Sequence, residues 1–223
     1  MKHKRALVWR CLIYGAGVIF MAVGLTLNTK TRLGVGAVAS IAYSGSLAWG
    51  MDYGRLTFVV YMAAILFQLL LKKENRNWKI CLQLPFSAVF STLLTLFDQY
   101  IQLSPTALWQ RLLMLLAAIG ITALGLLLMV DMKLIANPAD ALADTVGDLL
   151  GKDVGLGKNV IDAVSVTIAC AIGLAASGKP LGIGVGTVAA MLLTGRLVSF
   201  FRALLEEKIQ ALAGIGVPPA RTQ

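Results

Sequence analysis

The sequence predicts an all-α membrane protein with six transmembrane helices plus two re-entrant or half-helix segments, built as two inverted-topology repeats of three spans. Three observations lead to this prediction: long apolar blocks, an internal repeat, and two short segments of small residues. The chain has 223 residues, of which 58% are hydrophobic and 14% are charged. Soluble domains are typically about 45–50% apolar and about 25% charged, so no part of this chain is expected to form a soluble domain.

Apolar blocks account for the expected spanning helices. A transmembrane helix needs about 20 predominantly apolar residues. The N-terminal block follows basic residues, as in a signal peptide, but it exceeds the apolar region of about 7–15 residues that such peptides carry. We therefore expect it to remain as the first spanning helix. The blocks that reach or approach spanning length are Ala6–Asn28, Leu56–Leu71, Ile80–Ile101, Ala107–Val130, Asn159–Ser177 and Ile183–Phe201.

The chain matches itself at an offset of 101 residues without gaps. The most specific match pairs Gly50-Met-Asp-Tyr-Gly54 with Gly151-Lys-Asp-Val-Gly155. We expect residues 1–101 and 102–204 to form two membrane repeats, with 205–223 as a cytoplasmic C-terminal tail. Because each repeat would have an odd number of spans, the second is expected to lie inverted relative to the first, as in many transporters.

Each repeat also contains a segment of small residues after its first span, at Gly34–Trp49 and Ala136–Leu150. The second segment carries three aspartates, and an aspartate at the centre of a lipid-facing helix costs about 2.5–3.5 kcal/mol. Both segments are short for a crossing, which favours half-helices buried within the protein.

Basic residues flank the apolar blocks, as topology signals do in membrane proteins. This pattern places both termini and the Lys72–Lys79 loop in the cytoplasm, and the uncharged Gln102–Pro105 loop outside. The positive-inside rule holds as a bias, because four basic residues would lie outside. These four residues are Lys30, Arg32, Arg55 and Lys179.

The net charge of +9 does not indicate nucleic-acid binding, since no basic helix face carries interleaved aromatic residues.

Aspartates in the second small-residue segment are the first functional candidates, because an intramembrane carboxylate indicates function by default. Asn137 is the expected N-cap of a helix, and Asp140, Asp144 and Asp148 follow on one face of it. For Asp148 we favour a solvated position with Lys152 as its ion-pair partner. For Asp140, solute binding and a solvated helix face both stay open.

Two further charged residues lie inside expected spans. Asp162 either meets Asp140 or Asp144 across a cavity or forms an ion pair with Lys158 one turn earlier. Arg196, in the last span, needs a carboxylate partner or an anionic solute.

The last span opens with Gly182-Ile-Gly-Val-Gly186-Thr187. A phosphate-binding loop would need a preceding strand, so close helix packing or an unwound binding segment is the expected role. Near the outer surface, Asp98 is expected to pair with Arg111. The predicted substrate-binding residues are Asn137, Asp140, Asp144, Asp162, Gly186, Thr187 and Arg196.

Residues for catalysis or metal binding are scarce. His3 is the single histidine, and Cys11, Cys81 and Cys170 lie in apolar blocks without a paired spacing. A Ser-His-Asp triad and a His-based metal site are therefore excluded. We expect no enzyme activity, no metal and no cofactor.

The residues of the second half resemble those of the YczE/YyaS/YitT family of bacterial integral membrane proteins. The matching pieces are Asn137-Pro-Ala-Asp140, Gly155-Leu-Gly157, Asp162 and Gly184-Val-Gly-Thr187, and the resemblance covers essentially the whole chain. It implies a multi-pass protein of the bacterial cytoplasmic (inner) membrane and brings no established substrate. In the first repeat Gly36-Ala-Val-Ala39 replaces Asn-Pro-Ala-Asp, so any site is expected to be weighted to the second half.

These features favour a transporter of a small cationic or zwitterionic solute that uses the intramembrane aspartates. The expected partners are the lipid bilayer and a small-molecule solute; homo-oligomerisation stays open. The alternative is a membrane sensor or accessory subunit that binds a partner helix or a small ligand without transporting it. An aquaporin-like pore is disfavoured because Asn-Pro-Ala occurs once. A polar cavity reached by Asp140 and Asp162 would favour transport, and a packed core would favour the alternative.

Overall fold

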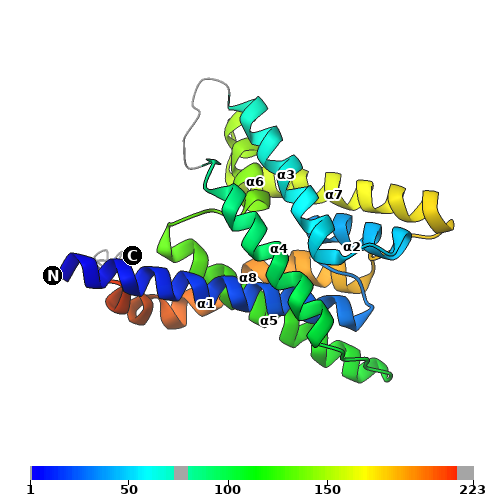
Figure 1. Cartoon of the computed structure of the whole chain (residues 1–223), viewed down its shortest axis with the longest axis horizontal. Coiled ribbons are helices and arrows are strands. Elements are labelled where there is room, and N and C mark those ends of the chain that lie inside the picture. The colour runs from blue at the N-terminus through cyan, green and yellow to red at the C-terminus, as the bar shows by residue number, and fades with distance from the viewer. Residues whose placement is uncertain (1, 73–79, 215–223) are drawn as a thin grey trace.

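The computed structural model describes residues 2–72 and 80–214, and these residues form eight helices and no strand (Figure 1). The prediction of an all-α protein is confirmed. The helices are α1 (Lys2–Thr31), α2 (Ala37–Trp49), α3 (Tyr53–Leu71), α4 (Gln83–Tyr100), α5 (Leu108–Met132), α6 (Pro138–Leu149), α7 (Val154–Ser177) and α8 (Val185–Ala213).

Five of these helices, α1, α3, α5, α7 and α8, are long and apolar enough to cross a membrane. The chain is therefore a multi-pass membrane protein. Helix α4, which covers the expected third span, has 18 residues and is not among the five. Its polar residues are the reason, since it carries two glutamines, an aspartate and several hydroxyl side chains in that short length.

Helix boundaries recur at the offset of 101 residues found in the sequence. The starts of α2 and α3 fall on the starts of α6 and α7, and the last residue of α1 falls on the last residue of α5. Among the described residues, the non-glycine positions with positive φ are Arg32 at 57° and Lys133 at 51°. These two residues are also 101 apart, and such backbone is uncommon outside glycine. The two halves of the chain thus share one local plan.

Helices α1 and α5 pack along each other in opposite directions. Gly17 lies against Gly125 and Met129, whereas Gly24, further along α1, lies against Ala118 and Thr122, earlier in α5. Small residues at such a crossing let two helix backbones approach closely, which is how helices associate in a membrane.

Each of these two helices has a second neighbour that runs in its own direction. Helix α4 runs parallel to α1, with Tyr14 against Phe86 at one end and Lys30 against Asp98 at the other. Helix α8 runs parallel to α5, with Ala190 packed near the start of α5 and Ile209 near its end.

Helix α6 runs from the middle of the bundle towards one end. At its start the Asn137 amide contacts Tyr61, in the middle of α3, and Met21, in the middle of α1. At its far end Asp148 contacts Lys72, which follows α3. With 12 residues, α6 is about 18 Å long, whereas the hydrocarbon core of a bilayer is about 30 Å thick.

The two halves differ in how their last two helices meet. In the first half α3 packs along α4, where Tyr61 stacks on Phe90 with ring centroids 5.8 Å apart, and Gln68 and Gln83 exchange hydrogen bonds of 3.1 Å. In the second half α7 packs against α2 and α6, and α7 and α8 are not packed along each other in the described residues.

Helix α8 continues beyond the expected end of the last span at Phe201. It runs to Ala213, and Ile209 and Ala213 are buried against α5. The expected tail at 205–223 therefore begins inside a packed helix, and 215–223 lie outside the described residues. So do the basic residues expected in the cytoplasmic loop after Lys72, which are Lys73, Arg76 and Lys79.

Two expected ion pairs were wrong in their partners. Asp98 pairs with Lys30 at 2.6 Å, while the Arg111 guanidinium donates to the carbonyl oxygen of Pro105. Asp98 meets Lys30 because α4 packs along α1 and ends beside it. Asp148 pairs with Lys72 at 3.2 Å because the end of α6 lies beside the end of α3.

Candidate functional site

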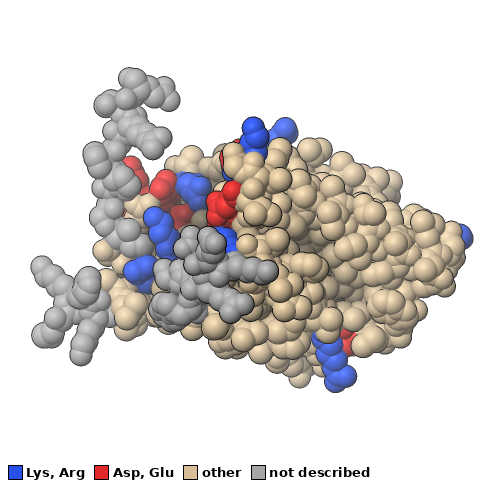
Figure 2. Space-filling model, turned by 90° about the horizontal axis from the view of Figure 1, so that it is seen from above, with Lys and Arg blue, Asp and Glu red and all other residues tan. Residues whose placement is uncertain are grey.

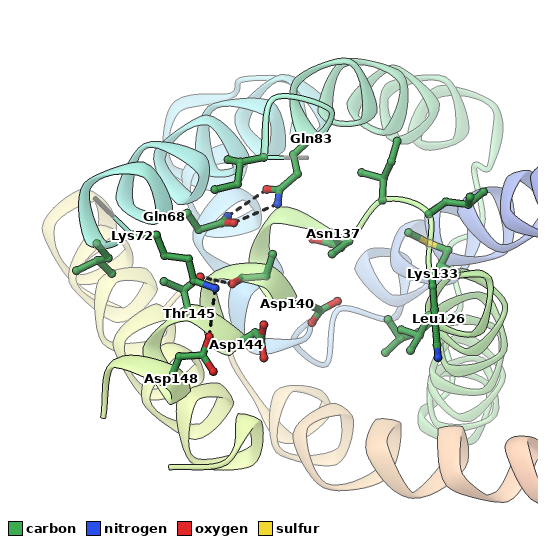
Figure 3. Close-up of a pocket in the computed structure, with 18 of the residues that line it drawn as sticks. Gln68, Lys72, Gln83, Leu126, Lys133, Asn137, Asp140, Asp144, Thr145 and Asp148 are labelled. Carbon is green, nitrogen blue, oxygen red and sulfur yellow. Dashed lines mark hydrogen bonds and ion pairs between the residues drawn. The ribbon is translucent and has the colours of Figure 1, made fainter. Parts of the chain in front are cut away.

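Two cavities meet at the start of α6. The first, here called the central cavity, has a volume of about 360 Å³ and is lined by both halves of the chain. The second, here called the vestibule, has a volume of about 910 Å³ and lies among the ends of α3, α5 and α6 (Figure 3). Leu126, Asn137 and Asp140 line both cavities, so these three residues form the boundary between them.

The central cavity lies where the two half-helices begin. The first turn of α2, from Gly36 to Ala39, and the first turn of α6, from Asn137 to Asp140, both line it. Its charged side chains are Asp140, Lys158 and Asp162. The wall is otherwise largely apolar, with aliphatic side chains from α1, α2, α5 and α8. A small number of polar groups on an apolar wall is typical of a small-molecule site.

Asn137 holds the start of α6 in place. Its side-chain oxygen accepts a hydrogen bond of 2.9 Å from the backbone N–H of Ala139, as an N-cap does. Its amide nitrogen donates to the Tyr61 hydroxyl at 3.0 Å. Both ends of this amide therefore have partners, so its part in the site is to fix the geometry between α6 and α3.

Asp140 lies in the first turn of α6 and is half-buried, and its side chain points into the space between the surrounding helices (Figure 3). No ion pair of the described residues includes it. Burial raises the pKa of its carboxyl group, and the negative charge of Asp162 adds to this, while Lys158 acts in the opposite direction. The positive end of the helix dipole acts in the same direction as Lys158, because it favours the charged carboxylate at this position.

Asp162 combines the two positions that the sequence left as alternatives, an ion pair with Lys158 and a place in a cavity with Asp140. Its side chain is buried and forms an ion pair with Lys158 at 3.4 Å, and it lines the central cavity together with Asp140. Lys158 therefore compensates Asp162, and Asp140 is the carboxylate of the cavity whose charge has no ion-pair partner among the described residues.

The other predicted site residues lie elsewhere. Asp144 lines the vestibule and not the central cavity. The backbone N–H of Gly186 donates to the carbonyl oxygen of Leu33 at 2.7 Å, and the Thr187 hydroxyl accepts from Gly184 N–H at 3.2 Å. Gly186 thus joins the start of α8 to the segment after α1, and Thr187 stabilises the first turn of α8. Arg196 is exposed on α8 and lines neither cavity. The structure brings together Asn137, Asp140 and Asp162 only.

Three polar residues of the cavity were not predicted from the sequence. Tyr61 holds Asn137, and Asn28 and Tyr53 are buried residues that also line the central cavity. The side-chain oxygens of Asn28 and Tyr53 have no hydrogen-bond partner in the described residues. The usable signal was their position, because polar side chains within apolar helices are generally functional or paired.

Metal binding has no support in the described part of the chain, where no group of three His, Cys, Asp or Glu side chains is arranged to hold an ion. Among protein families, the model of DUF6198, a family of unknown function, matches residues 8–203. Neither a curated protein nor a solved structure matches the chain.

Proposed function

The chain belongs to the DUF6198 family, whose function is unknown, and from its cavities we propose that it transports a small cationic or zwitterionic solute across a membrane. The observation that carries the proposal is the central cavity, where Asp140 and Asp162 from two different helices meet between the halves of the chain. Intramembrane carboxylates of this kind mark substrate, ion or proton pathways in transporters. On this proposal the protein is not an enzyme, and its partners are the lipid bilayer and the solute.

The proposed membrane arrangement has six spans, with α4 as the sixth, and α2 and α6 as half-helices. The two halves are proposed to be inverted repeats. The antiparallel packing of α1 and α5, which are equivalent by the offset of 101, supports this inversion. So does the pairing of α4 with α1 and of α8 with α5 in parallel directions, because α4 and α8 must then also be antiparallel. Half-helices that begin at a central site are a recurring feature of such transporters.

Both termini are proposed to be cytoplasmic, in the inner membrane of a bacterium. On the face seen in Figure 2, charged side chains gather mostly at the end of the molecule where α1 begins, and the rest is a broad surface with few charged side chains. Arg10, Lys72 and Lys133 belong to the same end, since Arg10 donates to the Met132 carbonyl oxygen and Lys72 lines the vestibule with Lys133. A concentration of basic residues marks the cytoplasmic side, so the vestibule would open to the cytoplasm.

The charges of the cavity support a solute with a cationic group. Lys158 compensates Asp162, which leaves the carboxylate of Asp140 available to a cation. Because a carboxylate without a partner is costly inside an apolar bundle, a cation that binds there gains affinity from the relief of this cost.

A binding screen on the purified chain tests the proposal. Thermal unfolding in detergent is measured with a panel of cationic and zwitterionic metabolites, and hits are followed by uptake into proteoliposomes. We expect at least one solute to raise the unfolding temperature of the wild type and to be taken up.

The matched variants are Asp140→Asn and Asp148→Asn, which make the same change on the same helix. Asp140→Asn is expected to abolish solute-dependent stabilisation and uptake while the protein stays folded, because Asn keeps the size and loses the charge. Asp148→Asn is expected to be mild, since Asp148 is exposed in its pair with Lys72. If both variants are silent or both unfold, the aspartate face is a solvated or scaffolding surface and the transport proposal fails.

A sensor or accessory subunit is the second candidate, and the exposed surface of α8 is the observation in its favour. Only 6% of the residues in the spanning window of α8 are buried within the chain, which leaves its face free for a partner helix as well as for lipid. Solute binding without uptake in proteoliposomes would favour this second candidate. The resemblance to YczE/YyaS/YitT proteins stays a prediction.

A further inference from the structure

The starts of the two half-helices are equivalent in sequence position and opposite in chemistry. At the offset of 101, Gly36 corresponds to Asn137, and Ala39 corresponds to Asp140. Helix α6 therefore begins with a side-chain cap and a carboxylate in its first turn. Helix α2 begins without either, since no side chain caps it and its first turn has no acidic residue.

The first turn of α2 therefore presents unsatisfied donors to the central cavity. The first N–H groups of a helix have no acceptor within the helix, and the dipole places a partial positive charge of roughly half a unit there. Ala37, Val38 and Ala39 all line the cavity, so this positive end faces the space that Asp140 faces from the other side.

Two buried side chains of the same cavity are also unsatisfied. Tyr53 is 2% exposed and Asn28 is 3% exposed, and neither the Tyr53 hydroxyl nor the Asn28 side-chain oxygen has a partner in the described residues. Both residues line the central cavity. Leaving such groups buried without a hydrogen bond costs about 1–3 kcal/mol each, so each has a free-energy reason to bind a ligand.

These polar groups occur in the first half only. By the offset of 101, Asn28 corresponds to Met129 and Tyr53 corresponds to Val154. The half of the cavity that has the carboxylate thus lacks these groups, and the half that has these groups lacks the carboxylate. A ligand with a positive group at one end and a negative group at the other complements both halves.

From this juxtaposition we propose that the solute is a zwitterion whose carboxylate binds at the start of α2. The N–H groups of the first turn of α2 and the Tyr53 hydroxyl donate hydrogen bonds to that carboxylate. The cationic group of the solute lies at Asp140, on the other side of the cavity. The solute's carboxylate takes the position in the first half that Asp140 occupies in the second. This inference rests on the proposed function and names the solute class for the same cavity.

The size of the cavity agrees with a small zwitterion. Ligand sites generally have volumes of roughly 300–1,000 Å³, and the central cavity, at about 360 Å³, is at the lower end of that range. An amino acid or a betaine is small enough for a cavity of this volume.

Paired probes test the carboxylate. Binding to the full-length protein in detergent is measured by calorimetry for the common L-amino acids, β-alanine and glycine betaine, and for the carboxamide of each. The carboxamide keeps the cationic group and the shape and loses the negative charge. The best zwitterion is expected to bind at least about tenfold more tightly than its carboxamide, since hydrogen bonds to charged groups contribute about 1.5–3 kcal/mol.

Two variants locate the effect. Ala39→Asp places a fixed carboxylate in the first turn of α2 and is expected to lower zwitterion affinity about tenfold or more, with carboxamide affinity kept. Tyr53→Phe is expected to lower the preference for the zwitterion about fivefold. The matched control is Tyr43→Phe, because the Tyr43 hydroxyl donates to the Thr29 carbonyl oxygen and Tyr43 does not line the cavity.

The outcomes separate this inference from the proposed function. If carboxamides bind as tightly as zwitterions, or if neither variant changes the preference, the carboxylate site is wrong and cation transport stands. If acetate or inorganic phosphate alone binds as tightly as the zwitterions, the solute class is wrong. If no zwitterion and no carboxamide binds while a cationic metabolite raises the unfolding temperature, this inference fails and the proposed function stands. If nothing in either set binds, both fail.

Discussion

At the scale of single residues, the surroundings of Asp140 separate it from the other aspartates of α6. Asp148 is exposed and paired with Lys72, and Asp144 lines the vestibule but not the central cavity. Asp140 borders both cavities, beside the apolar side chain of Leu126 and the amide of Asn137. On the proposed function, a carboxylate at this boundary would take up a cation or a proton from either cavity.

The pH dependence of stability is predicted to report on Asp140. Burial raises the pKa of its carboxyl group above the ordinary value of 3.8, so the unfolded chain loses this proton first as the pH rises. The contribution of Asp140 to stability is therefore complete below pH 3.8 and is lost as the pH rises through the raised pKa of the folded protein. Without solute, Asp140→Asn should match the wild type in acid and become the more stable protein at higher pH.

Thermal unfolding of the two proteins across pH checks this prediction. A constant difference between wild type and Asp140→Asn at every pH would contradict it, because titration of the carboxyl group would then not differ between the folded and unfolded states.

Asn137→Ala is predicted to destabilise the protein by about 2 kcal/mol. The substitution removes an N-cap, which contributes about 1 kcal/mol, and a buried hydrogen bond to Tyr61, which contributes about as much again. Tyr61→Phe removes the second interaction alone and should cost about 1 kcal/mol. Reversible unfolding in mixed micelles measures both, and equal effects for the two variants would contradict the capping role.

For single residues, the sequence predicts which polar side chains line a site better than it predicts their hydrogen-bond and ion-pair partners. The cost of burying a carboxylate pointed to Asp140, Asp144 and Asp162, of which Asp140 and Asp162 line the central cavity. Asn137 was predicted as an N-cap, and it caps α6; solute binding by these residues stays a prediction. Arg196 shows the limit, because the sequence does not say which face of α8 is turned outward. Asn28 and Tyr53 were missed because a single polar side chain in an apolar run resembles ordinary packing until its neighbours are known.

At the scale of helices, the crossing of α1 and α5 depends on small residues. A Cβ atom at Gly24 would approach the backbone nitrogen of Thr122 to 2.7 Å and the carbonyl oxygen of Ala118 to 2.9 Å. Backbone atoms cannot rotate away as side chains do, so the two helices would have to separate.

Gly24→Ala is predicted to destabilise the protein by about 1–3 kcal/mol, the usual cost of overpacking. Gly15→Ala makes the same change in the same helix, where a Cβ atom meets nothing within 4 Å. It should be neutral, or stabilising by up to about 1 kcal/mol through helix propensity. Unfolding in mixed micelles measures both variants, and a similar effect for both would show that the crossing tolerates separation.

Sequence reasoning at this scale depended on the repeat. Small-residue segments at equivalent places in the two repeats predicted half-helices, and α2 and α6 lie within these segments. The repeat could not predict that α8 continues to Ala213. That extension is stabilised by burial of Ile209 against α5 and by an ion pair of 3.0 Å between Arg202 and Asp131, contacts between parts of the chain far apart in sequence.

At the scale of the whole molecule, the proposed orientation in the membrane rests on the end at which charged side chains gather. A cysteine at Ser104, in a chain lacking Cys11, Cys81 and Cys170, is predicted to react with an impermeant thiol reagent from the outside only. A cysteine at Lys152, in the turn after α6, should react from the cytoplasmic side only. Labelling of sealed vesicles of known orientation measures both, and reaction at Ser104 from the cytoplasmic side alone would reverse the proposed topology.

The unequal packing of the last two helices in each half has a consequence for the conformations that the protein can adopt. If the halves are built on one plan, each can adopt the arrangement that the other has in this structure. Separation of α3 from α4 and closure of α7 on α8 would then give a second conformer, with the Tyr61–Phe90 stack broken. The two conformers would be related by the approximate two-fold symmetry of the repeats. The free-energy difference between them would then come from the side chains that differ between the two repeats. Ala39 opposite Asp140 is such a pair, and a zwitterion bound between them would shift the balance between a protein open to one compartment and a protein open to the other.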